Sequence, residues 1–511
     1  MMHSFLTTSP DSKSPAGQGP QGNSCLQQPK PNRCDGCTCS SMGFRSITRR
    51  CALNTVYLWL TAASGALGGL LFGYDWVVIG GAKPFYEIYF HLTSPELQGW
   101  AMSCALVGCL AGAGAAGPLG DRFGRKHLLS LSALVFAASS LGTAAAARFA
   151  VFVAWRIFGG FAIGLASCIS PMYIAEISPP RLRGRLISLN QMALVTGILL
   201  AQVVNWLIAR PVPAGATAAD IIASWNGQSG WRWMFGVTAI PSLLFLAATF
   251  FVPESPRWLA ARGRHRQALG VLRRLGGESY ASQVMSELRT ASGDESRVSL
   301  IHELSHSGLA RALVLGIVLA VLQQWCGINV IFNYAQEIFA AAGYQISGIL
   351  FNIIITGAVN VVFTVVALAT IDRVGRRFLL LTGTAGLAII YAILGALYRF
   401  HFHGVLMLAL VLAAISCYAM SLAPVTWVVI SEIFPNRIRA GAVSVAVTSL
   451  WVACFVLTCT FPLLNAALGT AGVFLLYAAI CIVGLVFLCR RLPETRNRSL
   501  EEIETSIRNA E

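Results

Sequence analysis

The sequence predicts an all-α membrane protein with twelve transmembrane helices in two six-helix bundles. Three observations lead to this fold class: only 12% of the 511 residues are charged, apolar segments recur along the chain, and its two halves carry matching charged motifs. Soluble domains carry about 25% charged residues, so this chain has too little charge to cover its apolar surface in water. Apolar segments of about 20 residues can cross the hydrocarbon core, and in lipid they must be helical because a helix satisfies its own backbone hydrogen bonds.

The chain begins with a polar tail. Residues 1–50 are rich in Pro, Gly, Ser and Gln and lack apolar periodicity, so we predict a disordered N-terminal segment. The tail holds the cysteine cluster Cys34, Cys37 and Cys39, with Cys25 before it. No histidine or second Cys-x-x-Cys pair follows nearby, which argues against a metal site. We therefore expect neither a metal nor a cofactor.

Apolar segments follow the tail in two groups of six. We predict spans at residues 54–80, 97–118, 127–147, 149–172, 186–208, 231–252, 312–334, 347–370, 378–398, 404–430, 443–465 and 470–489. The stretch between the groups is polar, rich in arginine and partly amphipathic. The predicted domains are the tail (1–50), an N-terminal bundle (51–252), a cytoplasmic helical linker (253–310), a C-terminal bundle (311–490) and a cytoplasmic C-terminal tail (491–511).

The net charge of +15 is distributed in a pattern typical of membrane proteins. Basic residues gather in clusters between alternate spans, whereas the other loops carry few. The clusters are Arg122, Arg125 and Lys126; Arg181, Arg183 and Arg185; Arg373, Arg376 and Arg377; and Arg437 with Arg439, and the sparse loops hold Lys83, Arg148, Arg210 and Arg399. This positive-inside pattern predicts cytoplasmic clusters and cytoplasmic termini. Nucleic-acid binding is not indicated because there is no contiguous basic patch.

The two groups of spans repeat each other's loop motifs. The motif Gly117–Lys126 closes the second span, and Asp372–Arg377 closes the eighth, six spans later. The motif Glu176–Gly184 after the fourth span matches Glu432–Ala440 after the tenth. Two matched motifs at corresponding places indicate a duplicated six-helix unit, the parallel repeat found in one large class of transporters.

Three further motifs resemble those of a known family. They are Pro253–Leu259 (PESPRWL) after the sixth span, Pro493–Glu501 (PETRNRSLE) after the twelfth, and Gln323–Asn329 (QQWCGIN) in the seventh. From about residue 54 to 505 the chain resembles the sugar porters of the major facilitator superfamily, which include bacterial sugar–proton symporters and animal facilitative glucose transporters. The resemblance implies two bundles around a central cavity that opens alternately to each side of the membrane.

A carboxylate inside the first span is the candidate for proton coupling. Asp75 lies in a segment where a charge costs about 2.5–3.5 kcal/mol on insertion scales, so it needs a partner. Arg156 in the fourth span is the other charge deep in the first repeat. The pair could separate when Asp75 takes a proton, or it could be purely structural. In the symporters that this chain resembles, an Asp and an Arg at these places serve proton coupling, and related uniporters tend to lack the carboxylate.

Amide side chains in the seventh span are the candidates for solute binding. Gln323, Gln324, Asn329 and Asn333 can each donate and accept hydrogen bonds, as sugar hydroxyls require. On a regular helix Gln324 and Asn329 would lie about 140° apart, so Gly327 between them indicates a bend or a broken helix, as in other transporters. The alternative is that the amides hydrogen-bond between helices as part of the packing.

The resemblance extends this site to other spans. It adds Gln191 in the fifth span, Asn360 in the eighth and Trp427 in the tenth, where the indole would contact the apolar face of a sugar. Asn333 stands where relatives often have Tyr, and Leu450 and Cys454 stand where they often have amides. Ile198 is the residue type found in glucose carriers. These departures leave hexose and pentose open and favour a hexose.

The charged loop motifs predict a gating network. We expect four pairs: Asp121 with Arg125, Asp372 with Arg376, Glu176 with Arg183, and Glu432 with Arg439. An exposed pair contributes about 0–1 kcal/mol, so a network of such pairs can bias a two-state opening without preventing it. The alternative is that these charges only anchor the topology.

Together these patterns predict a secondary active transporter that imports a monosaccharide with a proton by alternating access. A facilitative sugar uniporter and a non-transporting sugar sensor of the same fold remain the alternatives. We expect no enzyme, because the Ser–His–Asp order, HExxH, a Walker A motif and GxGxxG in a strand–turn–helix context are all missing from the sequence. The expected location is a plasma membrane, as a multi-pass monomer in a bacterial inner membrane, with the lipid bilayer as its partner.

Overall fold

The computed structural model describes residues 54–213, 215–291, 307–344, 346–402, 404–434 and 439–494. All regular secondary structure in these ranges is helical. The predicted tail over residues 1–50, including its cysteine cluster, lies outside the described residues. So do most of residues 491–511 and residues 292–306 of the predicted linker.

The first half of the chain (residues 54–251) forms the first group of long helices. They are α1 (Thr55–Tyr89), α2 (Pro95–Phe123), α3 (Arg125–Ala145), α4 (Phe149–Ile177) and α5 (Arg183–Ile208), then the short α6 (Ala218–Ala223), the π-helical turn η1 (Asn226–Gly230), α7 (Trp231–Gly236) and α8 (Ala239–Phe251). The last three are continuous enough to form one span over Asn226–Phe251. Helix α1 runs nine residues beyond the predicted end of the first span, so Lys83, expected in a loop, is instead buried inside a helix.

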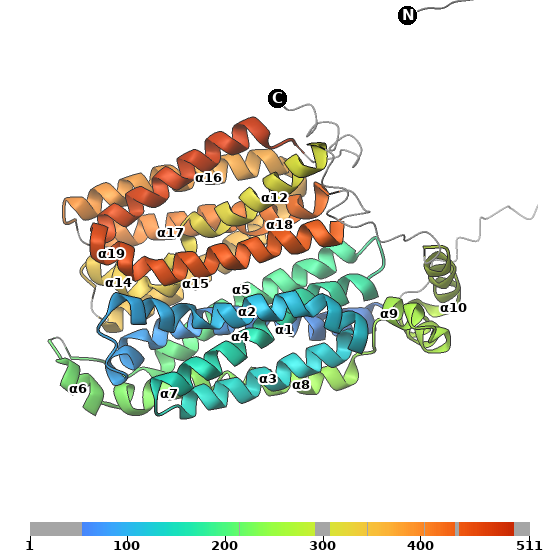
Figure 1. The fold of residues 1–511 in the computed structure, drawn as a ribbon, viewed down its shortest axis with the longest axis horizontal. Coiled ribbons are helices and arrows are strands. Elements are labelled where there is room, and N and C mark those ends of the chain that lie inside the picture. The colour runs from blue at the N-terminus through green and yellow to red at the C-terminus, as the bar shows by residue number, and fades with distance from the viewer. Residues whose placement is uncertain are drawn as a thin grey trace, which may run out of the picture. The chain divides into compact units, whose positions relative to one another are not determined.

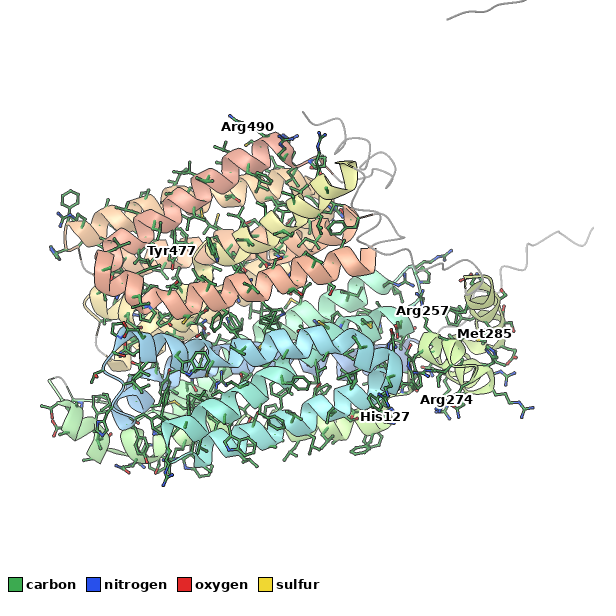
Figure 2. All side chains as sticks on the ribbon, in the orientation of Figure 1. His127, Arg257, Arg274, Met285, Tyr477 and Arg490 are labelled. Carbon is green, nitrogen blue, oxygen red and sulfur yellow. The ribbon has the colours of Figure 1, made fainter. Side chains whose placement is uncertain are left out.

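Two helices of the predicted linker follow. They are α9 (Pro256–Ala261) and α10 (His265–Ala291), and α10 is interrupted at Gly276 and Gly277, where the backbone is not helical. Trp258 and Leu259 of α9 pack with Leu272 and Met285 of α10 in a small apolar cluster of their own. Figure 2 shows Arg257, Arg274 and Met285 on this pair of helices, which lies beside the end of the long helices near His127.

The second half (residues 307–494) forms the other group. Its helices are α12 (Ser307–Trp325), α13 (Ile328–Asn333), α14 (Ala335–Ala341), α15 (Ile346–Val374), α16 (Arg376–Arg399), α17 (Val405–Met420), α18 (Leu422–Glu432) and α19 (Arg439–Arg491). The described residues hold 11 helical segments long and apolar enough to span a membrane, against twelve predicted. The difference lies in α19, where the eleventh and twelfth predicted spans adjoin at Gly469, whose φ of +68° turns the chain without a loop.

In Figure 1 the helices of the first half (blue to green) lie in one layer and those of the second half (yellow to red) in another. The charged motifs at Asp121–Arg125 and Arg376 lie at one end of the long helices, which we call the motif end. The linker helices lie there too, because Trp258 Nε1 donates to the backbone oxygen of Asp121. The opposite end, where α1 finishes and α2 begins, is called the far end.

Glycines let the helices of each half approach closely. A Cβ atom on Gly73 of α1 would overlap the backbone oxygen of Leu194 in α5, and one on Gly160 of α4 would overlap that of Ala105 in α2. Small residues at such crossings are typical of membrane helices, because association in lipid depends on close packing rather than on the hydrophobic effect. These contacts fix the crossings of α1 with α5 and of α2 with α4 within the first half.

Candidate functional site

Asp75 and Arg156 form a buried ion pair between α1 and α4, as the sequence predicted. Arg156 Nη1 donates to both carboxylate oxygens of Asp75, at 2.8 Å and 2.9 Å. The side chain of Asp75 is only 9% exposed and that of Arg156 only 5%. The guanidinium also lies 5.4 Å from the ring centre of Phe235 in α7. A proton on Asp75 would remove its charge and weaken the charge-assisted hydrogen bonds that hold Arg156.

The geometry of this pair is not the one that gives the greatest stability. Arg–carboxylate pairs are strongest when two guanidinium nitrogens meet two oxygens in a fork, whereas here one nitrogen serves both oxygens. Within the described part of the chain, Arg156 Nε has no hydrogen-bond partner. A buried unsatisfied donor costs about 1–3 kcal/mol. The pair is therefore one that the protein can separate more readily than a full fork.

The amides of the seventh span form a chain of hydrogen bonds. Gln323 Nε2 donates to the backbone oxygens of Leu422 and Ala423 in α18, at 3.3 Å and 3.2 Å. Gln324 Nε2 donates to Gln323 Oε1 at 3.4 Å, and Asn329 Nδ2 donates to Gln324 Oε1. All three side chains are buried. These hydrogen-bonded amides lie inside the protein near the end of α12. There they can exchange their bonds to one another for bonds to a solute.

The break predicted at Gly327 is confirmed. Helix α12 ends at Trp325, α13 begins at Ile328, and Gly327 between them has a φ of +85°, a left-handed conformation. A Cβ on Gly327 would lie 2.6 Å from the ring of Tyr477, so both the backbone conformation and the packing require glycine. This break brings Gln324 and Asn329 into contact, which a regular helix would not allow.

The remaining predicted binding residues are less closely connected. Asn333 and Asn360 are buried, Gln191 is half-buried and Trp427 is 40% exposed. Asn333 Oδ1 has no hydrogen-bond partner in the described ranges. No hydrogen bond among the described residues joins Gln191, Asn360 or Trp427 to the amide chain. Their grouping with it remains a prediction.

Gln202 of α5 is one of several buried amides that the sequence did not single out. It is 1% exposed, and neither its nitrogen nor its oxygen has a hydrogen-bond partner among the residues described. Its oxygen lies against Gly357 of α15, in the second half. The helical period could have revealed it, because Gln202 follows Gln191 by about three turns and shares its face.

The charged motifs pair within each half at the motif end. Arg125 binds Asp121 at 3.3 Å, as predicted, and also Glu176 at 3.1 Å. The predicted partner of Glu176, Arg183, is therefore wrong: the end of α4 lies beside the start of α3, where Arg125 is the nearer cation. In the second half, Arg376 binds Glu432 at 3.3 Å. The side chains of Asp372 and Arg439, predicted to pair with these residues, lie outside the description.

Two acidic residues complete this end and were not singled out as site residues. Glu254 Oε1 accepts hydrogen bonds from the backbone N–H groups of Arg125 and Lys126, at 2.9 Å and 3.1 Å. Glu494 accepts the equivalent bond from Arg376 at 3.1 Å. A carboxylate at a helix N-terminus satisfies free N–H groups and meets the positive end of the helix dipole. The signal was in the repeated Pro-Glu that follows the sixth and twelfth spans.

The two halves contact each other closely at the far end. A Cβ on Gly99 of α2 would overlap the backbone oxygen of Cys459 in α19, and one on Gly80 of α1 would lie 3.0 Å from that of Phe332 in α13. Trp100 and Phe455 add an edge-to-face ring contact, with centres 6.5 Å apart. Backbone contacts of this kind leave no room for a solute, so the structure is closed at the far end along these helices.

This contact predicts the effect of a single methyl group. Gly99→Ala should reduce the turnover of any process that requires far-end closure, because α2 and α19 must separate to admit Cβ. Overpacking typically costs about 1–3 kcal/mol, which corresponds to about a 5- to 150-fold shift of a two-state equilibrium. The measurement is solute flux in proteoliposomes. Gly114→Ala on the same helix is the control, because its Cβ would meet nothing within 4 Å; equal flux in both variants would contradict the prediction.

Comparisons with known proteins agree on one group. The family model described as "Sugar (and other) transporter" matches residues 61–506. The D-xylose-proton symporter of Escherichia coli (strain K12) is 36% identical over 487 residues, covering 88% of this chain and 96% of that protein. The arabinose-proton symporter of Bacillus subtilis (strain 168) is 38% identical over 459 residues, covering 90% and 96%. The solved structure of the E. coli xylose transporter XylE in a partially occluded inward open conformation has a TM-score of 0.76 and 34% identity, covering 87% of this chain and 100% of that one.

Proposed function

The chain belongs to the sugar transporter family, and on that premise we propose that it imports a monosaccharide together with a proton by alternating access. The observation that carries the proposal is the buried ion pair between Asp75 and Arg156. A purely facilitative carrier has no need to bury an ionisable carboxylate at this cost. Relatives at 36% and 38% identity are named proton symporters for xylose and arabinose.

The solute site is proposed from the buried amides. The chain of hydrogen bonds through Gln323, Gln324 and Asn329 offers donors and acceptors at alternating positions, and monosaccharide hydroxyls need both. We assign the solute to the following residues: Gln191, Gln323, Gln324, Asn329, Asn333, Asn360 and Trp427. When a sugar enters, it would replace amide–amide bonds by amide–hydroxyl bonds, so no buried polar group is left without a partner.

Transport then requires the two ends to open in turn. The motif end is proposed to face the cytoplasm, since its basic clusters follow the positive-inside rule; both termini would then be cytoplasmic. With the far end closed, solute would leave through the motif end. The networks of Arg125 with Asp121 and Glu176, and of Arg376 with Glu432, would strengthen when that end closes. The proposed setting is a bacterial inner membrane, with the protein acting as a monomer.

Proton coupling follows from the charge of Asp75. In the ionised form Asp75 holds Arg156, and in the protonated form it releases the guanidinium to other acceptors. A bound proton and a bound sugar would both favour the conformation that can switch the side on which the passage is open. The proton and the sugar would therefore cross the membrane together. The proton would leave when the motif end opens and the hydrogen bonds between Arg156 and the carboxylate of Asp75 re-form.

Uptake of a panel of labelled monosaccharides into proteoliposomes, with and without a protonophore, tests this function. Symport predicts accumulation above the external concentration, and the protonophore should reduce it to equilibration. Uptake that never exceeds equilibration and ignores the protonophore would identify a uniporter. Absence of counterflow with every sugar would favour the sensor. A variant at an exposed acid, Asp220→Asn, is the matched control and should accumulate sugar like the unmodified protein.

A further inference from the structure

A buried lysine near the far end has no part in the mechanism described so far. Lys83 of α1 is 3% exposed. Its ammonium group binds Glu87, one turn further along the same helix, at 3.0 Å, and Glu337 of α14. It also lies 5.5 Å from the ring centre of Tyr334. A buried ammonium group is costly unless it is paired and hydrogen-bonded, so these contacts account for its presence inside a helix.

The ion pair with Glu337 joins the two halves. Lys83 belongs to the first half and Glu337 to the second, and 254 positions separate them in the chain. The ion pairs of Arg125 and Arg376 at the motif end, in contrast, each join residues of one half. Gly80, three residues before Lys83, is in close contact with the backbone of α13. The ammonium group of Lys83 therefore lies where the first and second halves meet at the far end.

Lys83, Glu87 and Glu337 are arranged so that Lys83 keeps a partner when the halves separate. Glu87 lies on α1 itself and would stay beside Lys83 if α14 moved away. Glu337 is 26% exposed, more than Glu87 at 12%, and it could hydrate as it left. Neither Glu87 Oε1 nor Glu337 Oε2 has a hydrogen-bond partner among the described residues. Opening would thus leave no isolated charge buried, which is the requirement for an ion pair that must break and re-form.

Helix α14 has the form of a segment that can move. It is seven residues long, from Ala335 to Ala341, and the chain is non-helical at Tyr334 before it. Gly343, just after it, has a φ of +90°. The break at Gly327 lies one short helix earlier. Interruptions on both sides allow α13 and α14 to pivot without unfolding α12, because a few residues at element ends can absorb the change in backbone angles.

We propose that Lys83 is a gate-positioning residue: its ion pair with Glu337 holds α14 against α1 and closes the far end of the solute passage. When the pair separates, α14 moves away and the far end opens, while Glu87 retains Lys83. This role rests on the proposed transport function. The structure identifies Glu337 as the partner of Lys83 and the solute need not be known, so the ion pair can be tested independently of the sugar.

The test compares four full-length variants by hydrogen–deuterium exchange in lipid nanodiscs without sugar. They are Lys83→Met, Glu337→Gln, the charge swap Lys83→Glu with Glu337→Lys, and the control Glu96→Gln, which changes an exposed acid in the first turn of α2. Both single variants should speed amide exchange in residues 328–344 by about 5- to 150-fold, the usual range for coupled sites. The charge swap should restore slow exchange, and the control should not change it.

A structural role would give a different result. If Lys83 only stabilised the fold, exchange would rise across the chain, including α3, and the charge swap would not reverse it. Unchanged exchange in residues 328–344 of both single variants, or a charge swap no better than either, would overturn the proposal. If Lys83→Met does not fold, Glu337→Gln still tests it, because Lys83 then keeps Glu87. Counterflow by the unmodified protein is measured separately, so failure of the transport function would be recognised as such.

Discussion

Asp75→Asn abolishes accumulation of sugar against its gradient but leaves sugar exchange intact: this is the expected result with the largest functional effect. Asparagine has nearly the size of aspartate, and its oxygen can still accept a bond from Arg156, so the fold and the passage should survive. It cannot bind a proton and release Arg156 in the same cycle. Transport then becomes independent of the proton gradient.

The size of the effect follows from the driving force. One proton crossing 100 mV releases about 2.3 kcal/mol, which supports roughly a 40-fold sugar concentration ratio since each 1.4 kcal/mol is tenfold. In the Asn variant the ratio should fall to about 1, whereas counterflow of labelled sugar should stay within about tenfold of the unmodified rate, the span of 1.4 kcal/mol. Undiminished accumulation by Asp75→Asn would reject Asp75 as the coupling residue and favour a structural ion pair.

The largest expected effect on stability comes from Arg156→Met. Methionine fills much of the volume of arginine but leaves Asp75 buried without its cation. Removing one partner of a buried ion pair costs about 3–5 kcal/mol, because the remaining charge is uncompensated. The free energy of unfolding should fall by that amount, measured by denaturant titration or thermal inactivation of the purified protein in detergent.

A double variant separates loss of the pair from loss of packing. In Asp75→Asn/Arg156→Met no charge remains, so most of the lost stability should return. Arg148→Met is the matched control, since Arg148 is exposed at the start of the same helix, and exposed substitutions usually change stability by less than about 0.5 kcal/mol. If the double variant is as unstable as Arg156→Met alone, Arg156 contributes through packing and not through its charge.

Much of the fold could be predicted because the bilayer imposes a segment-by-segment requirement. Each span must be long, apolar and helical by itself, so hydropathy found the spans without knowledge of their neighbours. Boundaries were less certain: α1 continues to Tyr89, which placed Lys83 in a helix and not in a loop. The last two predicted spans, 443–465 and 470–489, adjoin in α19 and turn at Gly469, which lies in the short gap predicted between them.

The sequence alone was enough to predict the membrane class, the duplicated motifs and the need for a partner to Asp75, because the cost of a buried charge is a property of the segment that carries it. It also indicated the break at Gly327. Which side chains meet could be seen only in the folded protein. The partner of Glu176 is Arg125, the amides of α12 and α13 bond in a chain, and Lys83 reaches Glu337 in the other half. Such pairings depend on the rotation, depth and crossing of whole helices, and these are set by close packing between segments far apart in the chain.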